Sequence, residues 1–333
     1  MSQTTRQPVA EPRDAPSQGM RILPFQRNDR HRLTRLCAGL GDHANLRFGD
    51  FVDHYYAGSE WCRLHMLLDD RDETLGLIGV ERMPFATPEG PITLGFGTNY
   101  RAYQPGAGGV MLLHWLDQCD FGLVFGGNEL THRILKQQTW TWYPGIRQLR
   151  LDEARRLRRV PDLPPVQLRE ESEFTTDLLP TRSPFAFRLA PNCDYLNWRY
   201  GTALPFVRYR VFRILCDGRT AGYVVLNLKL DLLLVAQCDG DDPQTLTAGI
   251  LEAIRTAAEG DRQRQPVSMV ASHTPMIDAL CRAGFRGHPD ERPFIVSGRN
   301  GPPPIPADTG TWLVSLDWGD NGLRYPFLGQ PHL

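Results

Sequence analysis

The sequence predicts an α/β protein of the α+β kind, made of two tandem domains that each hold a mixed, mostly antiparallel central sheet flanked by helices. Three observations predict this. The length of 333 residues is about twice the roughly 150 residues of an ordinary domain. Between residues 20 and 150, strand-like and helical patterns follow the order β-α-β-β-β-(Gly turn)-α-β-α-β. A similar order, with little residue identity, returns between residues 186 and 298.

The first half is expected to begin with a short strand and a helix whose apolar residues recur at helical spacing. Three strand-like runs come next, separated by a charged turn and a Pro/Gly segment. Two antiparallel hairpins are the simplest way to assemble these strands. The helix after the glycine turn would face the sheet with Val110, Leu113, Trp115 and Leu116. In chain order, the expected elements are strand 21–25, helix 31–40, strands 61–68, 75–83 and 92–99, helix 110–119, strand 121–125, helix 129–138 and extended chain 140–149.

The remaining segments complete the domain organisation. Residues 1–19 are polar and contain no apolar core, which predicts a disordered arm rather than a signal peptide. Residues 151–185 are Arg- and Pro-rich and are expected to be a linker. Residues 299–333 are expected to form a C-terminal tail that includes one more strand, at 312–316.

Composition excludes several classes of function. A net charge of −1 gives no overall field that would favour DNA or an anionic membrane. The seven cysteines are scattered, with no C-x-x-C pair and no histidine at ligand spacing, so no metal site is expected. No apolar run approaches the roughly 18 residues of a membrane span. The sequence therefore predicts a cytoplasmic protein without a membrane span, and it leaves the oligomeric state open.

The most informative segment is the glycine-rich turn Tyr103-Gln104-Pro105-Gly106-Ala107-Gly108-Gly109, directly after the third strand-like run of the first half. Glycines at the start of a helix allow backbone N–H groups to approach a phosphate closely, and the helix dipole favours the negative charge. The preceding run, 92–99, would offer exposed strand-edge groups to an extended amide-containing ligand.

This turn resembles the acyl-CoA loop of the GNAT acetyltransferase superfamily, whose pattern is Gln/Arg-x-x-Gly-x-Gly/Ala at the end of the fourth strand. Gly106 and Gly108 match the two glycines, whereas Tyr103 stands in place of Gln/Arg. The resemblance implies acetyl-CoA or another acyl-CoA as co-substrate. The coenzyme-binding residues that it implies are Tyr103, Gln104, Gly106, Ala107, Gly108, Gly109 and Asn128.

A second match follows at 128–140, which resembles the GNAT pattern N-x-x-A-x-x-L-Y-x-K-x-G-F. Asn128, Ile134 and Trp140 occupy the Asn, Leu and Phe places, and Leu135 stands where many members carry the tyrosine that protonates the departing thiolate. The second half ends similarly at 280–285. Its counterpart of the coenzyme turn, 239–243, contains three aspartates, which would repel a pyrophosphate. The whole chain is thus similar to tandem GNAT proteins, and 194–200 resembles a segment of bacterial members linked to envelope polysaccharide clusters.

Candidate residues for chemistry are fewer. The resemblance implies a general base, often a Glu on the fourth strand, but residues 92–100 contain no acid. Glu81 on the neighbouring strand is the nearest replacement, with His43, His54 and His114 as further candidates.

Aromatic residues suggest where an acceptor could bind, because aromatic faces stack on CH-rich rings. Trp142 is one candidate. Tyr195, Trp198 and Arg199 lie within about one turn of a predicted helix and form either a substrate surface or a surface on which the two domains dock.

The leading hypothesis is an acyl-CoA-dependent N- or O-acyltransferase that acts on a small metabolite or an envelope sugar. A catalytically degenerate tandem GNAT-like binding or scaffold protein is the alternative, because the usual Gln/Arg, Tyr and Glu are missing. An aminoacyl-tRNA-dependent transferase of the Fem type, which also doubles this fold, is a third possibility that arginine patches such as 155–159 keep open.

Overall fold

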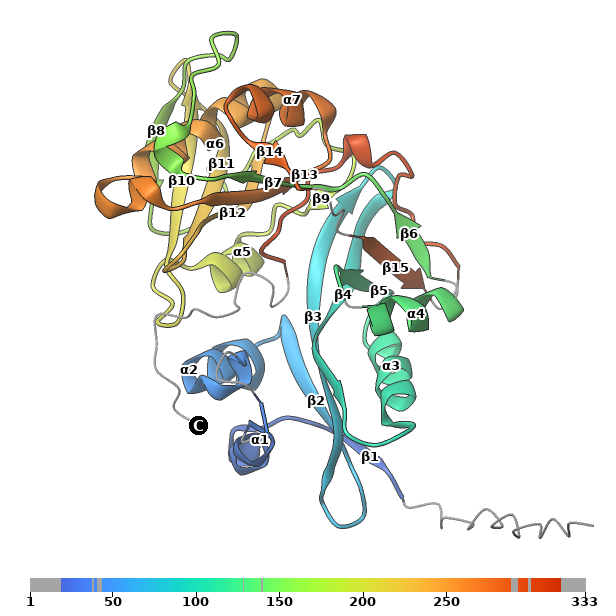
Figure 1. Ribbon diagram of the computed structural model, residues 1–333. Helices are drawn as coiled ribbons and strands as arrows, with labels where there is room; N and C mark the ends of the chain where they lie inside the picture. The colour runs from blue at the N-terminus through green and yellow to red at the C-terminus, as the bar shows by residue number, and fades with distance from the viewer. Residues whose placement is uncertain are drawn as a thin grey trace, which may run out of the picture.

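A computed structural model describes residues 19–37, 39–40, 44–127, 129–138, 140–288, 293–298 and 301–318. Within them the chain forms two large β-sheets with helices on their faces (Figure 1). The predicted fold class is confirmed: both sheets are mixed and mostly antiparallel. The expected N-terminal arm, 1–19, lies almost entirely outside the described residues.

The first sheet has eight strands, and β4 and β5 form its parallel pair. The long hairpin of β3 and β4 dominates it, because Thr87 and Gly90 close a tight turn between two strands of more than ten residues. The strand β9 (Arg188–Leu189) pairs with β3 off the main path. Along that path the order is β1 (Arg21–Pro24), β2 (Cys62–Leu68), β3 (Thr74–Thr87), β4 (Gly90–Ala102), β5 (Phe121–Phe125), β15 (Phe294–Gly298) and β6 (Thr141–Tyr143).

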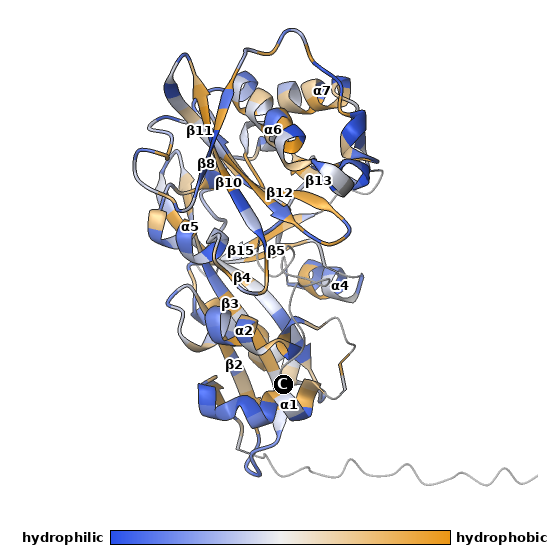
Figure 2. Cartoon of the chain, turned by 90° about the vertical axis from the view of Figure 1, so that its left-hand side faces the viewer, coloured by the Kyte–Doolittle hydropathy of each residue, from blue (hydrophilic) through white to orange (hydrophobic). Residues whose placement is uncertain are grey.

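The second sheet has seven strands, with β12 and β13 as its parallel pair. Its central strands are largely hydrophobic along their length, as expected for strands that are covered on both faces (Figure 2). The order is β14 (Arg286–Gly287), β7 (Arg147–Leu151), β13 (Val267–Ala271), β12 (Leu233–Gly240), β11 (Arg219–Leu228), β10 (Tyr209–Cys216) and β8 (Gln167–Glu171).

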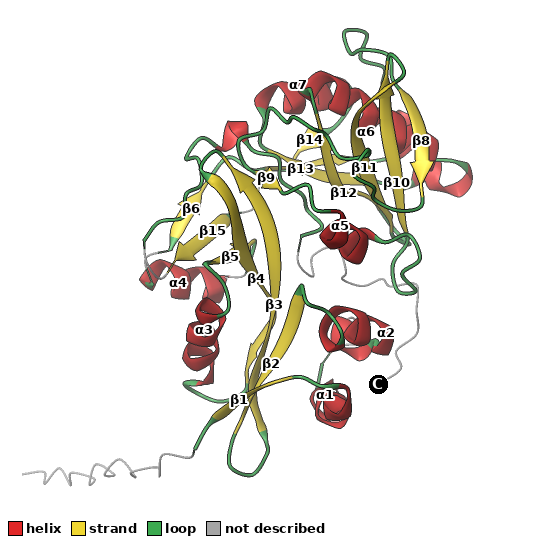
Figure 3. Ribbon diagram, turned by 180° about the vertical axis from the view of Figure 1, so that it is seen from behind, coloured by secondary structure: helices red, strands yellow, loops and turns green. Residues whose placement is uncertain are grey.

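Helices cover each sheet on its two faces. In the first half, α3 (Ala107–Asp117) and α4 (Glu129–Gln137) lie on one face, and α1 (Arg30–Cys37) and α2 (Gly49–Val52) lie on the other (Figure 1). A π-helical turn, Asp53–Ala57, continues α2. In the second half, α6 (Pro243–Ala257) and α7 (Thr274–Arg282) cover the outer face. The helix α5 (Cys193–Tyr200) lies between α2 and the second sheet in both views (Figures 1 and 3).

The face that α3 turns to the sheet agrees with the prediction at Trp115 and in part at Leu116, and differs from it at Val110 and Leu113. Met111, Leu112 and Trp115 are buried, whereas Val110 and Leu113 are 36% and 60% exposed. The helix has apolar residues on more than one side, so spacing alone did not single out the buried side. Its start at Ala107, set by Gly106, turns Met111 and Trp115 inward one turn apart.

The two sheets exchange strands. The strand β7, expected to close the first half, pairs with β13 in the second sheet. In return β15, from the end of the second half, lies between β5 and β6 in the first sheet. The expected domain boundary at residue 150 therefore falls inside a strand of the second sheet.

Two expected connecting segments are packed against the sheets. The expected linker, 151–185, contains β8 and buries Phe174 and Leu178. In the C-terminal tail, 312–316 forms one isolated bridge, between Phe187 and Trp312, rather than a strand. Trp312 is nevertheless fully buried, so the tail is part of the core.

Candidate active site

The glycine turn lies at the N-terminus of α3. Gly106 has a φ of +84° and is the N-cap residue, a conformation that favours glycine. The hydroxyl of Tyr100 donates to the carbonyl of Gly108 over 2.6 Å and fixes the first turn against β4. A Cβ at Gly106 or Gly109 would meet no atom within 4 Å. The start of the helix is therefore open at Gly106 and Gly109, whereas a Cβ at Gly108 would lie 3.0 Å from the Tyr100 hydroxyl oxygen.

The strands β4 and β5 separate beside this turn. They pair only where Leu94, Gly95 and Phe96 face Phe121, Gly122 and Leu123. From Gly97 to Ala102, β4 pairs with β3 alone among the described strands, while β5 continues along β15. The edge of β4 that leads to the glycine turn thus offers backbone groups to an extended ligand.

Most residues predicted to bind the coenzyme lie together at this turn. The backbone N–H of Tyr103 donates to the backbone carbonyl of Leu75 over 2.8 Å. The side chain of Tyr103 is 42% exposed. The carbonyl of Gln104 accepts the N–H of Ala107 over 3.2 Å. Asn128 lies outside the described residues. Leu135, at the place of the usual tyrosine, is buried in the cluster that includes α3.

Glu81 lies on β3 at the level where β4 and β5 separate. Its register partner on β4 is Phe96, the last residue of β4 that also pairs with β5. The side chain of Glu81 is completely buried on the face of the sheet covered by α2 and α5. Glu81 is therefore close to the point where a ligand lying along the free edge of β4 would reach the opened sheet.

The carboxylate of Glu81 is held by groups from both halves of the chain. The hydroxyl of Tyr55, from the π-helical turn, donates to Oε2, and that of Tyr195, from α5, donates to Oε1 over 2.6 Å. Arg199 Nε lies 3.6 Å from Oε1. Burial raises the pKa of both tyrosines well above its usual value, and the charge of Glu81 raises it further. The hydroxyls thus remain protonated donors.

Arg199 links Glu81 to the C-terminal segment. Its Nη1 donates to the Tyr209 hydroxyl over 2.8 Å, and its Nη2 donates to the backbone carbonyl of Asp317 and lies 3.3 Å from Asp317 Oδ1. Burial raises the pKa of the Asp317 carboxyl, whereas Arg199 acts to lower it. Glu81, Arg199 and Asp317 form a buried cluster of alternating charge, which we call the charged cluster.

An aromatic group surrounds the charged cluster. Trp198 stacks on Tyr55 with 5.1 Å between ring centroids, and Trp61 meets Tyr195 edge-on at 5.3 Å. His54 Nε2 lies 2.9 Å from the carbonyl of Trp198. Burial lowers the pKa of His54, although this hydrogen bond acts against the shift. Of the two histidine candidates among the described residues, His54 and His114, His54 is the one that contacts this group.

The other predicted residues lie elsewhere. Trp142 is on β6 beside α4, where His132 meets its ring edge-on at 5.3 Å and the Lys136 ammonium lies 5.2 Å from its centroid. It is therefore separated from Tyr195, Trp198 and Arg199, on the opposite face of the sheet. His114 packs against His65 between α3 and β2, and His43 lies outside the described residues.

Sequence reasoning missed Tyr55, Tyr209 and Asp317. Nothing in local spacing distinguishes them, because they come together only when α2, the second sheet and the C-terminal segment assemble. A fully buried arginine with carboxylate partners on either side is visible only in three dimensions.

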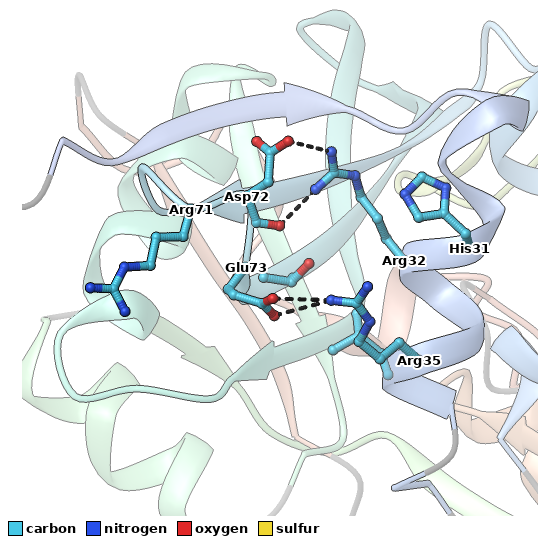
Figure 4. A pocket seen from close by; sticks show the side chains of 8 residues that line it. His31, Arg32, Arg35, Arg71, Asp72 and Glu73 are labelled. Atoms are coloured by element: carbon cyan, nitrogen blue, oxygen red, sulfur yellow. Dashed lines mark hydrogen bonds and ion pairs between the residues drawn. The ribbon is translucent and has the colours of Figure 1, made fainter.

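A surface cavity of about 220 Å³ lies between α1 and the turn that joins β2 and β3 (Figure 4). Its charged lining is paired internally: Arg32 binds Asp72, and Arg35 binds Glu73 over 3.0 Å. None of the predicted site residues that the structure describes lines it. It is therefore a crevice between ion pairs rather than part of the candidate site.

The described residues contain no group of three or more His, Cys, Asp or Glu side chains placed to hold a metal ion. None of the described helices is both long enough and apolar enough to cross a bilayer.

Comparison with known proteins identifies the fold. No family model matches the sequence, and no curated protein matches it significantly. Among solved structures, a tandem GNAT protein from the clavulanic acid biosynthesis pathway is similar at a TM-score of 0.54 and 13% identity, over 86% of this chain and 100% of that chain. GCN5-related N-acetyltransferases from Anabaena variabilis and Kribbella flavida are similar at TM-scores of 0.55 and 0.53, with 9% and 11% identity. Each of these two matches covers 84% of this chain. They cover 72% of the Anabaena protein and 71% of the Kribbella protein.

Proposed function

We propose that this chain, which has the tandem GNAT fold, is an acyl-CoA-dependent acyltransferase that binds its coenzyme in the first half. One observation carries the proposal. The free edge of β4 connects the glycine turn at Gly106 to Phe96, whose partner on β3 is Glu81. A coenzyme with its pyrophosphate at the turn and its pantetheine along β4 would bring the thioester to the level of Glu81.

The acceptor is proposed to be an amine or hydroxyl of a small metabolite or an envelope sugar. An amine with a pKa of about 10.4 is mostly protonated at neutral pH and has to lose a proton before it attacks. Glu81 is the carboxylate available as base. Since tyrosine hydroxyls occupy both of its oxygens, the proton would pass through the hydroxyl of Tyr55 or Tyr195 to Glu81.

The transfer itself balances without a further reactant. The acceptor nitrogen or oxygen attacks the thioester carbonyl carbon, the new C–N or C–O bond forms, and the C–S bond breaks. The acceptor proton goes to Glu81. Leu135 stands where a tyrosine acid would be, so the coenzyme thiolate takes its proton from solvent. Glu81 then returns the acceptor proton to solvent through the same tyrosine hydroxyl, and the base is regenerated.

Coenzyme binding is tested by titration calorimetry with acetyl-CoA and longer acyl-CoAs. Gly106→Asp places a carboxylate where the pyrophosphate would lie, and we expect it to weaken binding at least about 30-fold, since each lost or repelled charged contact is worth about 2 kcal/mol. Gly218→Asp is the matched control, because Gly218 also has a positive φ, +74°, and open space around its Cβ. Equal affinity of the two variants, or no binding by the unmodified chain at millimolar ligand, would contradict the proposal.

The role of Glu81 is tested with Glu81→Gln, which keeps the shape of the side chain. We expect kcat to fall about 10²–10⁴-fold, the usual contribution of general acid–base catalysis, with acetyl-CoA affinity unchanged. Thiol release from acetyl-CoA is measured with a panel of amines and amino sugars. An unchanged pH profile and rate would remove Glu81 from the mechanism.

A second candidate is a non-catalytic binding or scaffold protein. The complete burial of Glu81 beneath two tyrosines favours it. Acetyl-CoA binding that is unaccompanied by transfer to any acceptor in the panel would support this alternative.

A further inference from the structure

The second half repeats the divergence of strands seen in the first. The parallel pair of β12 and β13 is limited to Leu233 and Leu234 facing Val267 and Ser268. Beyond it β12 continues to Gly240 and leads through an acidic turn to α6. This arrangement corresponds to β4, β5, the glycine turn and α3 in the first half.

The C-terminal segment Trp312–Trp318 bridges this divergence. The hydroxyl of Ser315 donates to the backbone carbonyl of Ala236, two residues beyond the last paired residue of β12. At the other side, the hydroxyl of Ser272, just after the end of β13, donates to the carbonyl of Trp312 over 3.2 Å. Both contacts lie past the point where the two strands separate.

The segment is packed as core rather than as a loose tail. Trp312 and Trp318 are completely buried, and Trp318 Nε1 donates to Gln237 Oε1 on β12 over 3.2 Å. Asn227, on β11, donates to Asp317 Oδ2 over 3.5 Å. The segment thus contacts three successive positions of the second half: the end of β13, β12 and β11.

The acidic turn before α6 also has internal partners. The carboxylate of Asp242 caps α6 by accepting the backbone N–H of Thr245 over 2.7 Å. Asp239 pairs with Arg188 and accepts the hydroxyl of Ser183 over 3.0 Å. At the helix end that corresponds to the glycine turn, a carboxylate of the chain already occupies the place of an anion.

We propose that Trp312–Trp318 is a built-in occupant of the second half's coenzyme cleft, where it takes the place that the pantetheine arm of an acyl-CoA takes in the first half. The chain therefore binds one coenzyme, and the second half supports the first by packing against it at Glu81. This inference rests on the proposed function for its first-half site. The segment replaces the amide groups of a pantetheine with its own Ser315 hydroxyl and Trp312 carbonyl.

Hydrogen exchange of the full chain tests the occupancy directly. Without ligand, we expect peptides covering 235–240 of β12 to exchange at least about 100-fold more slowly than those covering 97–102 of β4, because a buried occupant confers protection and an open edge does not. Acetyl-CoA is expected to slow exchange at 97–102 and to leave 235–240 unchanged. Equally fast exchange at both edges, or protection of 235–240 only with acetyl-CoA, would overturn the proposal.

The variant Trp318→Ala loosens the segment. We expect exchange at 235–240 to rise at least about tenfold. Peptides covering β10 of the second sheet and β2 of the first are expected to keep their rates, which excludes general unfolding, because Trp318 also packs on Phe85 and Phe125 of the first sheet. Unchanged exchange at 235–240 would argue against the segment as occupant. In Trp312→Ala, which acts at the other end, the same rise is expected.

The stoichiometry of acetyl-CoA binding, measured by calorimetry, separates the proposal of an acyltransferase from the proposal that Trp312–Trp318 fills the second cleft. One acetyl-CoA per chain is the expected result, and two would overturn the occupant while leaving the acyltransferase intact. No binding at all would defeat the acyltransferase, and protection at 235–240 would still decide whether the segment fills the cleft.

Discussion

At the scale of single residues, the charged cluster joins the two halves of the chain through buried charges. Arg199 is the guanidinium between the carboxylates of Glu81 and Asp317, and all three are buried. A buried ion pair contributes little compared with well-packed apolar residues, but removing one partner leaves an uncompensated charge. Loss of the central guanidinium is therefore expected to cost more stability than loss of a surface charge.

Arg199→Met is expected to lower the free energy of unfolding by about 3–5 kcal/mol, because it leaves buried carboxylates without their counter-charge. Arg282→Met is the control, since Arg282 forms an exposed ion pair with Asp162 and such pairs contribute about 1 kcal/mol or less. Urea denaturation measures both. A similar decrease in the free energy of unfolding of the two variants would show that the charged cluster contributes no more to stability than a surface ion pair.

A second residue-scale prediction concerns pH. Burial lowers the pKa of His65 to about 4, with further lowering by His114 and Arg63, and its ring lies 4.5 Å from that of His114. The unfolded chain, with a histidine pKa near 6.5, binds the proton more tightly than the folded one. Stability is therefore complete above about pH 6.5 and is lost as pH falls toward 4, by at most about 3 kcal/mol at 1.36 kcal/mol per pKa unit.

Thermal unfolding of His65→Phe and of the unmodified chain between pH 4 and 7 measures this effect. We expect the substitution to flatten the dependence on pH in that interval. An unaltered slope would assign the acid sensitivity to other groups.

At the scale of elements, most helices and strands were predictable from periodicity, but strand partners were not. The extended run 140–149 read as one strand, yet it divides into β6 and β7, which belong to different sheets. Hydrophobic alternation reports that a strand has a buried face and says nothing about which sheet buries it. On α3 the prediction was right for Trp115 and wrong for Val110 and Leu113, because apolar residues also occur on the exposed side of this helix.

The break between β6 and β7 depends on Gly145, whose φ is +91° and whose Cβ position would lie 2.9 Å from Thr309 Oγ1. Gly145→Ala is expected to lower the free energy of unfolding by about 1–3 kcal/mol, through backbone strain and this contact. Gly287→Ala, with no atom within 4 Å of its Cβ, is expected to change it by about 0.5 kcal/mol or less. Equal effects in a denaturation series would contradict this account of the turn.

At the scale of the whole molecule, the sequence predicted the tandem architecture and the position of the glycine turn at the start of a helix. It also selected Glu81 together with Tyr195 and Arg199, although it could not show that they meet. The aspartate that completes the charged cluster lies 118 positions after Arg199, in a tail with no distinctive pattern. Contacts of that range depend on the assembled sheets, so single-sequence reasoning could not have found them.

The exchange of β7 and β15 has a consequence for synthesis on the ribosome. The first sheet needs β15, so β5 and β6 remain unjoined until residue 298 has left the exit tunnel. At a synthesis rate of about 5–20 residues per second, the N-terminal half remains roughly 10–30 s with an unpaired, hydrophobic strand edge. We therefore expect the nascent chain to bind chaperones that cover unpaired strand edges.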